Sequence, residues 1–244
     1  TGNPRDLHRG DRRPRQRCIR ASSYADVWGP ALAALAALTM TVGNVGALRQ
    51  QATRAYSAVR LLAWSSVGQA GYLLVPIAAA AYSDDAEHSI GSTVAYALMY
   101  AAVNLGAFAV AAVVGRANAT NRITDYRGLY AKNPLAALLL AFFLLCLAGL
   151  PPGIIGLFAK VTVFSAAVDA GLGWLAVVMA VNVVIALFYY LQWTALLFRA
   201  PEGEPVEHRL PAPLTAAIAV TGVLGVALSG APQLVLRFAD TGLF

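Results

Sequence analysis

Long apolar segments with few charges determine what this chain can fold into. Between Lys132 and Arg199 the only charged residues are Lys160 and Asp169. The whole chain is 59% hydrophobic and only 12% charged, whereas a typical soluble domain is about a quarter charged. Apolar runs of about 18 residues or more are long enough to cross a bilayer as helices. The sequence therefore predicts an all-α, polytopic transmembrane helix bundle, over residues 24–244.

Six crossings are expected, separated by polar segments. One of them, 134–170, would reach about 55 Å as a continuous helix, nearly twice the thickness of a bilayer core. Two half-helices with an unwound middle fit this length better, so we expect one broken helix. The predicted crossings lie at approximately 28–48, 60–82, 90–114, 134–170 (broken), 173–198 and 213–236.

The break is predicted where proline and glycine cluster in front of a lysine. Proline lacks an N–H and glycine adds backbone freedom. Broken backbone at membrane depth is tolerated where it is buried in protein or lines a wet cavity, and a charge at that depth costs about 2.5–3.5 kcal/mol. Lys160 is therefore a candidate proton or cation site; the alternative is a lysine that snorkels to the interface. The residues expected to form the break are Pro151, Pro152, Gly153 and Gly156.

Polar side chains recur at helical spacing on other predicted spans. Ser65, Gln69 and Tyr72 form one stripe on 60–82, and Tyr96 stands on a four-residue repeat in 90–114. Such stripes either make hydrogen bonds between helices or face a hydrated path. The candidate proton-path residues are Ser65, Ser66, Gln69, Tyr72, Tyr100, Asn104, Asn182 and Tyr189.

The sequence gives no sign of a metal or redox centre. Cys18 and Cys146 make no disulfide framework, and no His/Cys cluster has metal-ligand spacing. The three histidines, at 8, 88 and 208, all lie in polar segments. We therefore expect no cofactor and no metal in this chain.

The positive charge is concentrated at the start of the chain. Seven of the eighteen basic residues fall in the first twenty positions. Residues 1–23 contain no apolar run and are predicted to be a disordered tail. A basic arm of this kind can bind anionic lipid or nucleic acid. The orientation of the spans, described next, places this tail on the wrong face of the membrane. We therefore expect no nucleic-acid partner.

Loop charge predicts the orientation of the spans. The basic loops 49–60 and 115–133 should face the cytoplasm, whereas 83–89 carries no Lys or Arg and should face outward. With one crossing for the broken helix, 199–209 is also inside. The first span then begins outside, which places the arginine-rich tail on the wrong face. We therefore expect residues 1–23 to be foreign sequence, such as a frame-shifted or mispredicted start.

An ordered series of motifs resembles the subunit N family of proton-translocating NADH-quinone oxidoreductase, respiratory complex I. The resemblance covers about residues 28–244. The Ala-rich composition, with Arg in place of Lys, is typical of a high-GC bacterium. The motifs are TMTVGNVGALRQ (39–50), RLLAWSSVGQAGYLL (60–74), YAAVNLGAFAV (100–110), DYRGL (125–129), LAGLPPGIIGLFAK (147–160) and FYYLQ (188–192).

The resemblance implies a role and a position. Members are antiporter-like subunits with fourteen transmembrane helices, so this chain would be a C-terminal fragment of about six. Lys160 matches the lysine of the second broken helix, near the end of the proton path, and the residues of the break match as well. The implied function is proton translocation coupled to quinone reduction. The implied partners are other membrane subunits of complex I and the lipid bilayer of the bacterial inner (plasma) membrane, while NADH and quinone act elsewhere in the complex.

The chain also departs from the family pattern. It has Val59-Arg60 where many members have Lys-Arg, and Gln69 where many have His. Glutamine makes hydrogen bonds but does not titrate near neutrality. The break is one residue longer than usual. Two alternatives stay open: a subunit of a related cation/proton antiporter or membrane hydrogenase, and a truncated, non-functional remnant.

Overall fold

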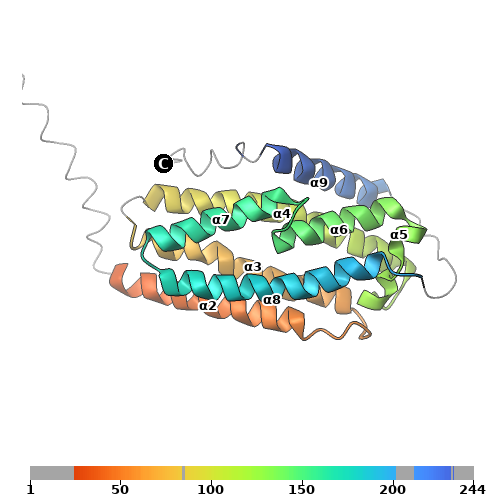
Figure 1. Ribbon diagram of the computed structural model, residues 1–244, viewed down its shortest axis with the longest axis horizontal. Helices are drawn as coiled ribbons and strands as arrows, with labels where there is room; N and C mark the ends of the chain where they lie inside the picture. The colour runs from red at the N-terminus through yellow and green to blue at the C-terminus, as the bar shows by residue number, and fades with distance from the viewer. Residues whose placement is uncertain (1–24, 84–85, 202–211, 232, 234–244) are drawn as a thin grey trace, which may run out of the picture.

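The computed structural model describes residues 25–83, 86–201, 212–231 and 233, which form an elongated helix bundle (Figure 1). Within these ranges there is no strand. Five of the described helices are long and apolar enough to cross a membrane. They are α2 (Ala25–Leu48), α3 (Ser57–Ala80), α4 (Ala86–Ala117), α8 (Gly173–Leu197) and α9 (Ala212–Gly230).

The segment predicted to be a broken crossing, 134–170, contains two shorter helices. Helix α6 (Pro134–Ala148) and helix α7 (Ile154–Asp169) follow one another along the long axis of the bundle, beside α8 (Figure 1). Two small elements, the 3₁₀ helix η1 (Ile123–Tyr126) and α5 (Leu129–Lys132), connect α4 to α6. The all-α bundle with one broken helix therefore agrees with the sequence prediction.

Helix boundaries differ from the predicted spans where end charges favour a longer helix. Helix α4 was expected over 90–114 but extends to Ala86 and Ala117. Its first turn contains Glu87 and its last turn Arg116, and both charges match the helix dipole. The end of the predicted span 213–236 and the tail 1–23 lie outside the described residues.

The close packing of α2 against α3 depends on glycine. A Cβ atom on Gly43 would lie 2.2 Å from the backbone nitrogen of Gly68, and one on Gly71 would lie 2.5 Å from that of Met40. Small residues allow transmembrane helices to approach closely. Helix α2 also packs on α8 with another part of its surface.

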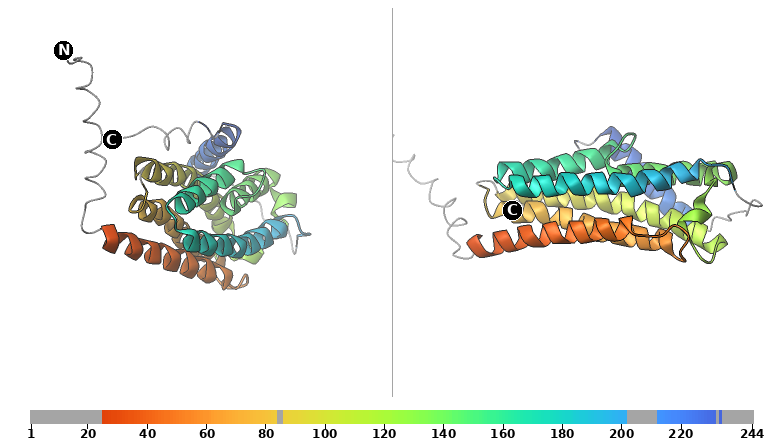
Figure 2. Two further views of the ribbon diagram at one scale, coloured as in Figure 1. Left: turned by 60° about the vertical axis from the view of Figure 1, so that its left-hand side comes forward. Right: turned by 60° about the horizontal axis from the view of Figure 1, so that its bottom comes forward.

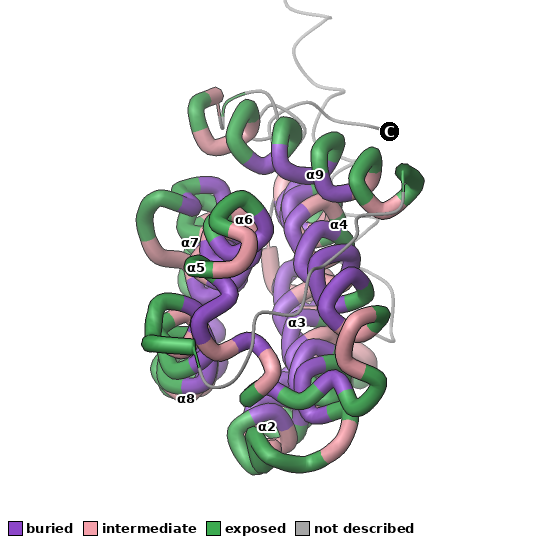
Figure 3. The backbone as a smooth tube through the Cα atoms, turned by 90° about the vertical axis from the view of Figure 1, so that its right-hand side faces the viewer, coloured by how far each residue is buried: buried purple, intermediate pink, exposed green. Residues whose placement is uncertain are grey.

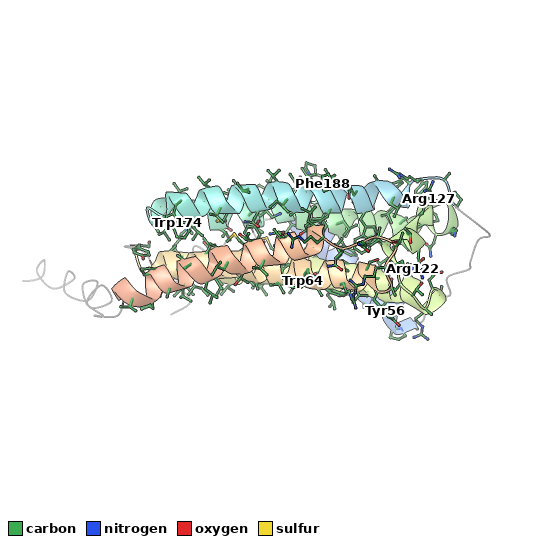
Figure 4. The ribbon with its side chains drawn as sticks, turned by 90° about the horizontal axis from the view of Figure 1, so that it is seen from below. Tyr56, Trp64, Arg122, Arg127, Trp174 and Phe188 are labelled. Atoms are coloured by element: carbon green, nitrogen blue, oxygen red, sulfur yellow. The ribbon has the colours of Figure 1, made fainter. Side chains whose placement is uncertain are left out.

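Three connections meet at one end of the bundle. The backbone nitrogen of Tyr56 donates to the carbonyl of Thr120 at 2.6 Å, and that of Gly128 donates to Leu196 at 3.2 Å. Figure 4 places Tyr56, Arg122 and Arg127 at this end and Trp174 at the other. The basic loops are thus joined at one end of the bundle, as expected if they face the same compartment. Which compartment this is stays a prediction.

Burial divides each helix into an inner and an outer face. Figure 3 shows the buried backbone of α3, α4 and α6 turned toward the middle of the bundle. Exposed apolar residues such as Val177, Val181, Val184 and Phe188 recur along α8, which lies at the outside of the bundle (Figure 2). An apolar outer surface of this kind suits a surrounding of lipid or of other transmembrane helices.

Candidate functional site

Lys160 is buried in the second turn of α7, with 6% of its surface exposed. Its ammonium nitrogen donates to the backbone carbonyl of Leu147 at 2.7 Å and to that of Ala148 at 2.6 Å. Both carbonyls belong to the last turn of α6. The side chain therefore turns into the protein, and it does not snorkel to the interface.

The helix break supplies these two acceptors. The last carbonyls of a helix have no partner within it. Gly149, at φ +85°, turns the chain so that its backbone nitrogen donates to Leu145 and Cys146. The carbonyls of Leu147 and Ala148 remain for Lys160. Because the C-terminal end of a helix carries partial negative charge, it also stabilises the ammonium.

Two glycines allow the start of α7 to pack on the end of α6. A Cβ atom on Gly156 would lie 1.7 Å from the carbonyl oxygen of Cys146, and one on Gly153 would lie 2.4 Å from its sulfur. Pro151 and Pro152 are exposed in the connecting turn, joined by a cis peptide bond. The predicted break residues thus fall into two groups. The prolines form the turn between the helices, and the glycines form the close contact that brings Lys160 to the carbonyls.

A small cavity lies on one side of Lys160. It has a volume of about 20 Å³, which is room for about one water molecule. Its polar lining comes from Gln69 on α3 and from Tyr96 and Tyr100 on α4, while Met99 and Val103 close it with apolar surface. The structure therefore brings hydrogen-bonding groups of two other helices, α3 and α4, to the lysine.

A wider groove borders Lys160 on the other side. It has a volume of about 520 Å³ and lies between the end of α6, α7 and α8. Its walls are apolar apart from Lys160, Ser165 and Asp169. Asp169 is exposed at the end of α7. Lys160 is thus the residue shared by the small cavity and the wider groove.

Buried polar residues of α3, α4 and α8 form a cluster beyond the small cavity. The hydroxyl of Tyr96 donates to the side-chain oxygen of Gln69. Ser65 and Tyr190 are joined through their hydroxyls, and the hydroxyl of Tyr72 donates to the carbonyl of Met179 at 3.4 Å. These contacts support the helix–helix interpretation of the polar stripe, although Gln69 also lines the cavity.

A second cluster joins α2 to α8. The hydroxyl of Tyr189 donates to Asn44 at 2.9 Å, and the amide of Asn44 donates to Asn182 at 3.1 Å. Asn182 in turn donates to the hydroxyl of Thr41 at 3.1 Å. The rings of Tyr189 and Tyr190 lie 4.5 Å apart, centre to centre, so the two clusters are neighbours.

Two of the predicted path residues lie apart from both clusters. The amide of Asn104 donates to the hydroxyl of Ser66 at 3.3 Å. The side-chain oxygen of Asn104 is buried without a hydrogen-bond partner among the described residues. This pair lies between α3 and α4 and does not line the small cavity.

Four members of the clusters are not among the candidate proton-path residues: Thr41, Asn44, Tyr96 and Tyr190. Tyr96 was recognised in the same four-residue repeat as Tyr100 but was not included as a candidate. Thr41 and Asn44 lie on the span 28–48, which is rich in Ala and Gly and has no polar stripe like that of 60–82. Their role depends on which face of α2 meets α8, and this cannot be read from the spacing of α2 alone.

Comparison with known proteins gives consistent results. Residues 17–186 match the family NADH:quinone oxidoreductase/Mrp antiporter, TM. The chain is 75% identical over 237 residues to NADH-quinone oxidoreductase subunit N 2 of Streptomyces griseus, with 91% of this chain and 44% of the relative covered. It is 47% identical over 180 residues to subunit N of Salinispora tropica, with 71% and 34% covered.

Solved structures show the same fold. A chain of respiratory complex I from Thermus thermophilus with bound Aureothin matches with a TM-score of 0.66 and 34% identity, over 85% of this chain and 45% of that one. The Mrp complex from Dietzia sp. matches with a TM-score of 0.77 over 93% of this chain and 49% of that one. At 20% identity, the second match shows the fold alone.

The matched relatives are longer than this chain, which spans about 44% of the length of the Streptomyces griseus protein. The matched family covers more than half of the chain and includes α2, α3, α4, α6, α7 and part of α8. The chain therefore belongs to the NADH:quinone oxidoreductase/Mrp antiporter transmembrane family, within which it is similar to subunit N of NADH-quinone oxidoreductase.

Proposed function

We propose that this chain is the C-terminal part of a membrane subunit of NADH-quinone oxidoreductase and contributes to proton translocation coupled to quinone reduction, with Lys160 as the proton-carrying group. One observation carries the proposal. The ammonium of Lys160 is buried at a helix break, held by two carbonyls of α6, and lies between a small cavity and a wider groove.

Access from two sides is what a translocating group requires. Such a group must receive a proton from one side and release it to the other. An ammonium has three N–H donors, and two of those of Lys160 are used by Leu147 and Ala148. On the cavity side, Tyr96, Gln69 and Tyr100 can orient a water molecule beside the lysine. On the groove side, Ser165 and Asp169 lead toward the end of α7.

The energy for transport would come from other subunits. We expect the redox chemistry of NADH and quinone to take place outside this chain, and other membrane subunits of complex I to be its partners. The 75% identity to a subunit N supports this assignment over an Mrp-type antiporter, to which the likeness is one of fold. The proposed location is the bacterial plasma membrane.

Replacement of Lys160 tests the proposal in the assembled complex. Lys160→Met keeps the length of the side chain and removes the titrating group. Lys160→Arg keeps the charge but does not release its proton. Both variants should lower the number of protons translocated per NADH oxidised, measured in inverted vesicles, while NADH oxidation by a soluble acceptor stays near the wild-type rate.

Thr162→Val is the matched control. Thr162 lies two residues further along α7, and its hydroxyl donates to the carbonyl of Ala159 in the same helix. Its replacement also removes one polar group from α7, but that group lines neither the cavity nor the groove. It should pump normally. If Lys160→Met pumps as many protons as Thr162→Val, the lysine is structural and the proposal is wrong.

A further inference from the structure

Two tyrosines of α4 contribute to the polar wall of the small cavity beside Lys160. Tyr96 and Tyr100 lie about one helical turn apart, and both line the cavity together with the lysine. Tyr96 is only 3% exposed, and Tyr100 is half-buried. A tyrosine hydroxyl has one hydrogen to donate and lone pairs that accept. What each hydroxyl can offer to the cavity therefore depends on where its hydrogen goes.

The hydrogens of both hydroxyls are directed to side chains of α3. Tyr96 donates to the side-chain oxygen of Gln69. Tyr100 forms a hydrogen bond with the hydroxyl of Ser66. Because Ser66 donates its own hydrogen to the carbonyl of Leu62 at 2.9 Å, Tyr100 is the donor in that bond. What the two tyrosine hydroxyls can still offer is therefore an acceptor.

Lys160 supplies the complementary donor. Of the three N–H bonds of its ammonium, two go to the carbonyls of Leu147 and Ala148. The remaining N–H can donate to a water in the cavity, whose volume of about 20 Å³ is room for about one molecule. That water can donate its two hydrogens to the two tyrosine oxygens. It then makes three hydrogen bonds, the usual number for a buried water.

We propose that Tyr96 is a positioning residue for proton exchange at Lys160: kept as an acceptor by Gln69, it holds the cavity water with its oxygen toward the ammonium. This inference rests on the proposed function, because it takes Lys160 as the group that exchanges protons. Gln69 acts through Tyr96. Its carboxamide does not titrate near neutrality, so its part is to fix the direction of the hydroxyl.

Tyr96→Phe tests this role in the assembled complex, because it keeps the ring and removes the hydroxyl. A cryo-EM map of the wild-type complex should show an ordered water within hydrogen-bonding distance of the Lys160 nitrogen and the Tyr96 hydroxyl. The map of the variant should lack it. The rate of proton translocation in inverted vesicles should fall about fivefold, the effect of losing about one net hydrogen bond. An empty cavity in the wild type, a water that persists in the variant, or an unchanged rate would overturn the proposal.

Tyr72→Phe is the matched control. Tyr72 is 1% exposed, its ring stacks on that of Tyr96 with centres 6.3 Å apart, and its hydroxyl donates to a carbonyl of α8. Its replacement removes a buried hydroxyl from the same neighbourhood, but that residue does not line the cavity. Water and rate should both stay as in the wild type. Loss of the water in this variant as well would show that packing, and not the Tyr96 hydroxyl, holds it.

Gln69→Leu tests the positioning of the hydroxyl with Tyr96 still in place. Without its acceptor, the hydroxyl can turn its hydrogen into the cavity, where it competes with the N–H of Lys160. The rate of translocation should again fall severalfold. A wild-type rate in Gln69→Leu would overturn the role given to Gln69.

Lys160→Met separates this inference from the proposed function. In the Lys160→Met background, Tyr96→Phe should lower translocation no further, because the group that it positions is gone. If Lys160→Met alone pumps normally, the proposed function fails and the role of Tyr96 fails with it. If Lys160→Met is impaired while Tyr96→Phe pumps at the wild-type rate, only the positioning role is wrong.

Discussion

At the scale of single residues, Asn44 links α2 to α8 through its side chain. Its amide nitrogen donates to Met40 and Asn182, and its oxygen accepts from Tyr189. We predict that Asn44→Ala destabilises the protein, because a buried polar group left without a partner costs about 1–3 kcal/mol. The midpoint of thermal unfolding of the purified complex should fall.

Ser165→Ala provides the comparison for this residue. Ser165 is exposed, and its hydroxyl donates only to Thr162 in its own helix. A surface substitution of this kind usually changes stability by no more than about 0.5 kcal/mol. If Asn44→Ala unfolds at the same temperature as Ser165→Ala, the cluster between α2 and α8 does not hold the helices together.

At the scale of elements, the close contact between α6 and α7 leaves no room for a side chain at Gly156. A Cβ atom there would lie 1.7 Å from the carbonyl oxygen of Cys146, so Gly156→Ala must push the two helices apart. Overpacking typically costs about 1–3 kcal/mol. The shift also moves Lys160 away from its two carbonyls. We therefore predict that this variant loses both thermal stability and proton translocation.

Gly173→Ala is the corresponding control. A Cβ atom on Gly173, at the start of α8, would have no neighbour within 4 Å. Alanine also favours a helix over glycine. This variant should keep wild-type stability and wild-type pumping. A Gly156→Ala protein that behaves like Gly173→Ala would mean that the break is free to adjust, and that its close packing has no part in placing the lysine.

At the scale of the whole molecule, α4 separates two ends that should face opposite compartments. Ala86 begins this helix and Ala119 follows its end, and its 32 residues span about 48 Å. We predict that cysteines at these two positions, in a full-length subunit without other cysteines, react with a membrane-impermeant reagent from opposite sides. In intact cells the cysteine at 86 should be labelled, and in inverted vesicles the one at 119.

Detergent-solubilised complex serves as the accessibility control, because both cysteines should be labelled there. Labelling of both positions from the same side of the membrane is incompatible with the proposed topology. Labelling of 119 in intact cells and of 86 in inverted vesicles would leave the crossings correct and reverse the orientation.

Much of this architecture could be predicted from the sequence because the bilayer limits the alternatives. Apolar length determines where helices cross, and proline and glycine determine where one of them breaks. Lys160 could be singled out as a candidate because a charge among apolar residues has few explanations, and its burial agrees with that choice. The start and end of α4 were missed by a few residues, since charged residues at both ends extend that helix beyond its apolar part.

The polar clusters could be predicted only in part. Spacing along one helix shows which residues share a face, so Ser65, Gln69 and Tyr72 were found. It does not show which other helix that face meets. Asn44 acquires its role from Asn182 and Tyr189, more than 130 positions later in the chain. The carbonyls that accept from Lys160 could not be predicted either. Every residue has a carbonyl, and only the fold determines which ones are left without a backbone partner.

The two carbonyls of α6 have a consequence for how Lys160 can work. A neutral amine still has two N–H bonds, so it can keep the same two acceptors after its charge is lost. The nitrogen then stays in place through a full cycle of protonation, with a lone pair replacing the third N–H. What must change is its neighbour: a water molecule that accepted from the ammonium has to turn and donate to the amine. If Lys160 carries protons as proposed, each gain and loss of a proton is accompanied by the reorientation of a neighbouring water, and the side chain itself stays where it is.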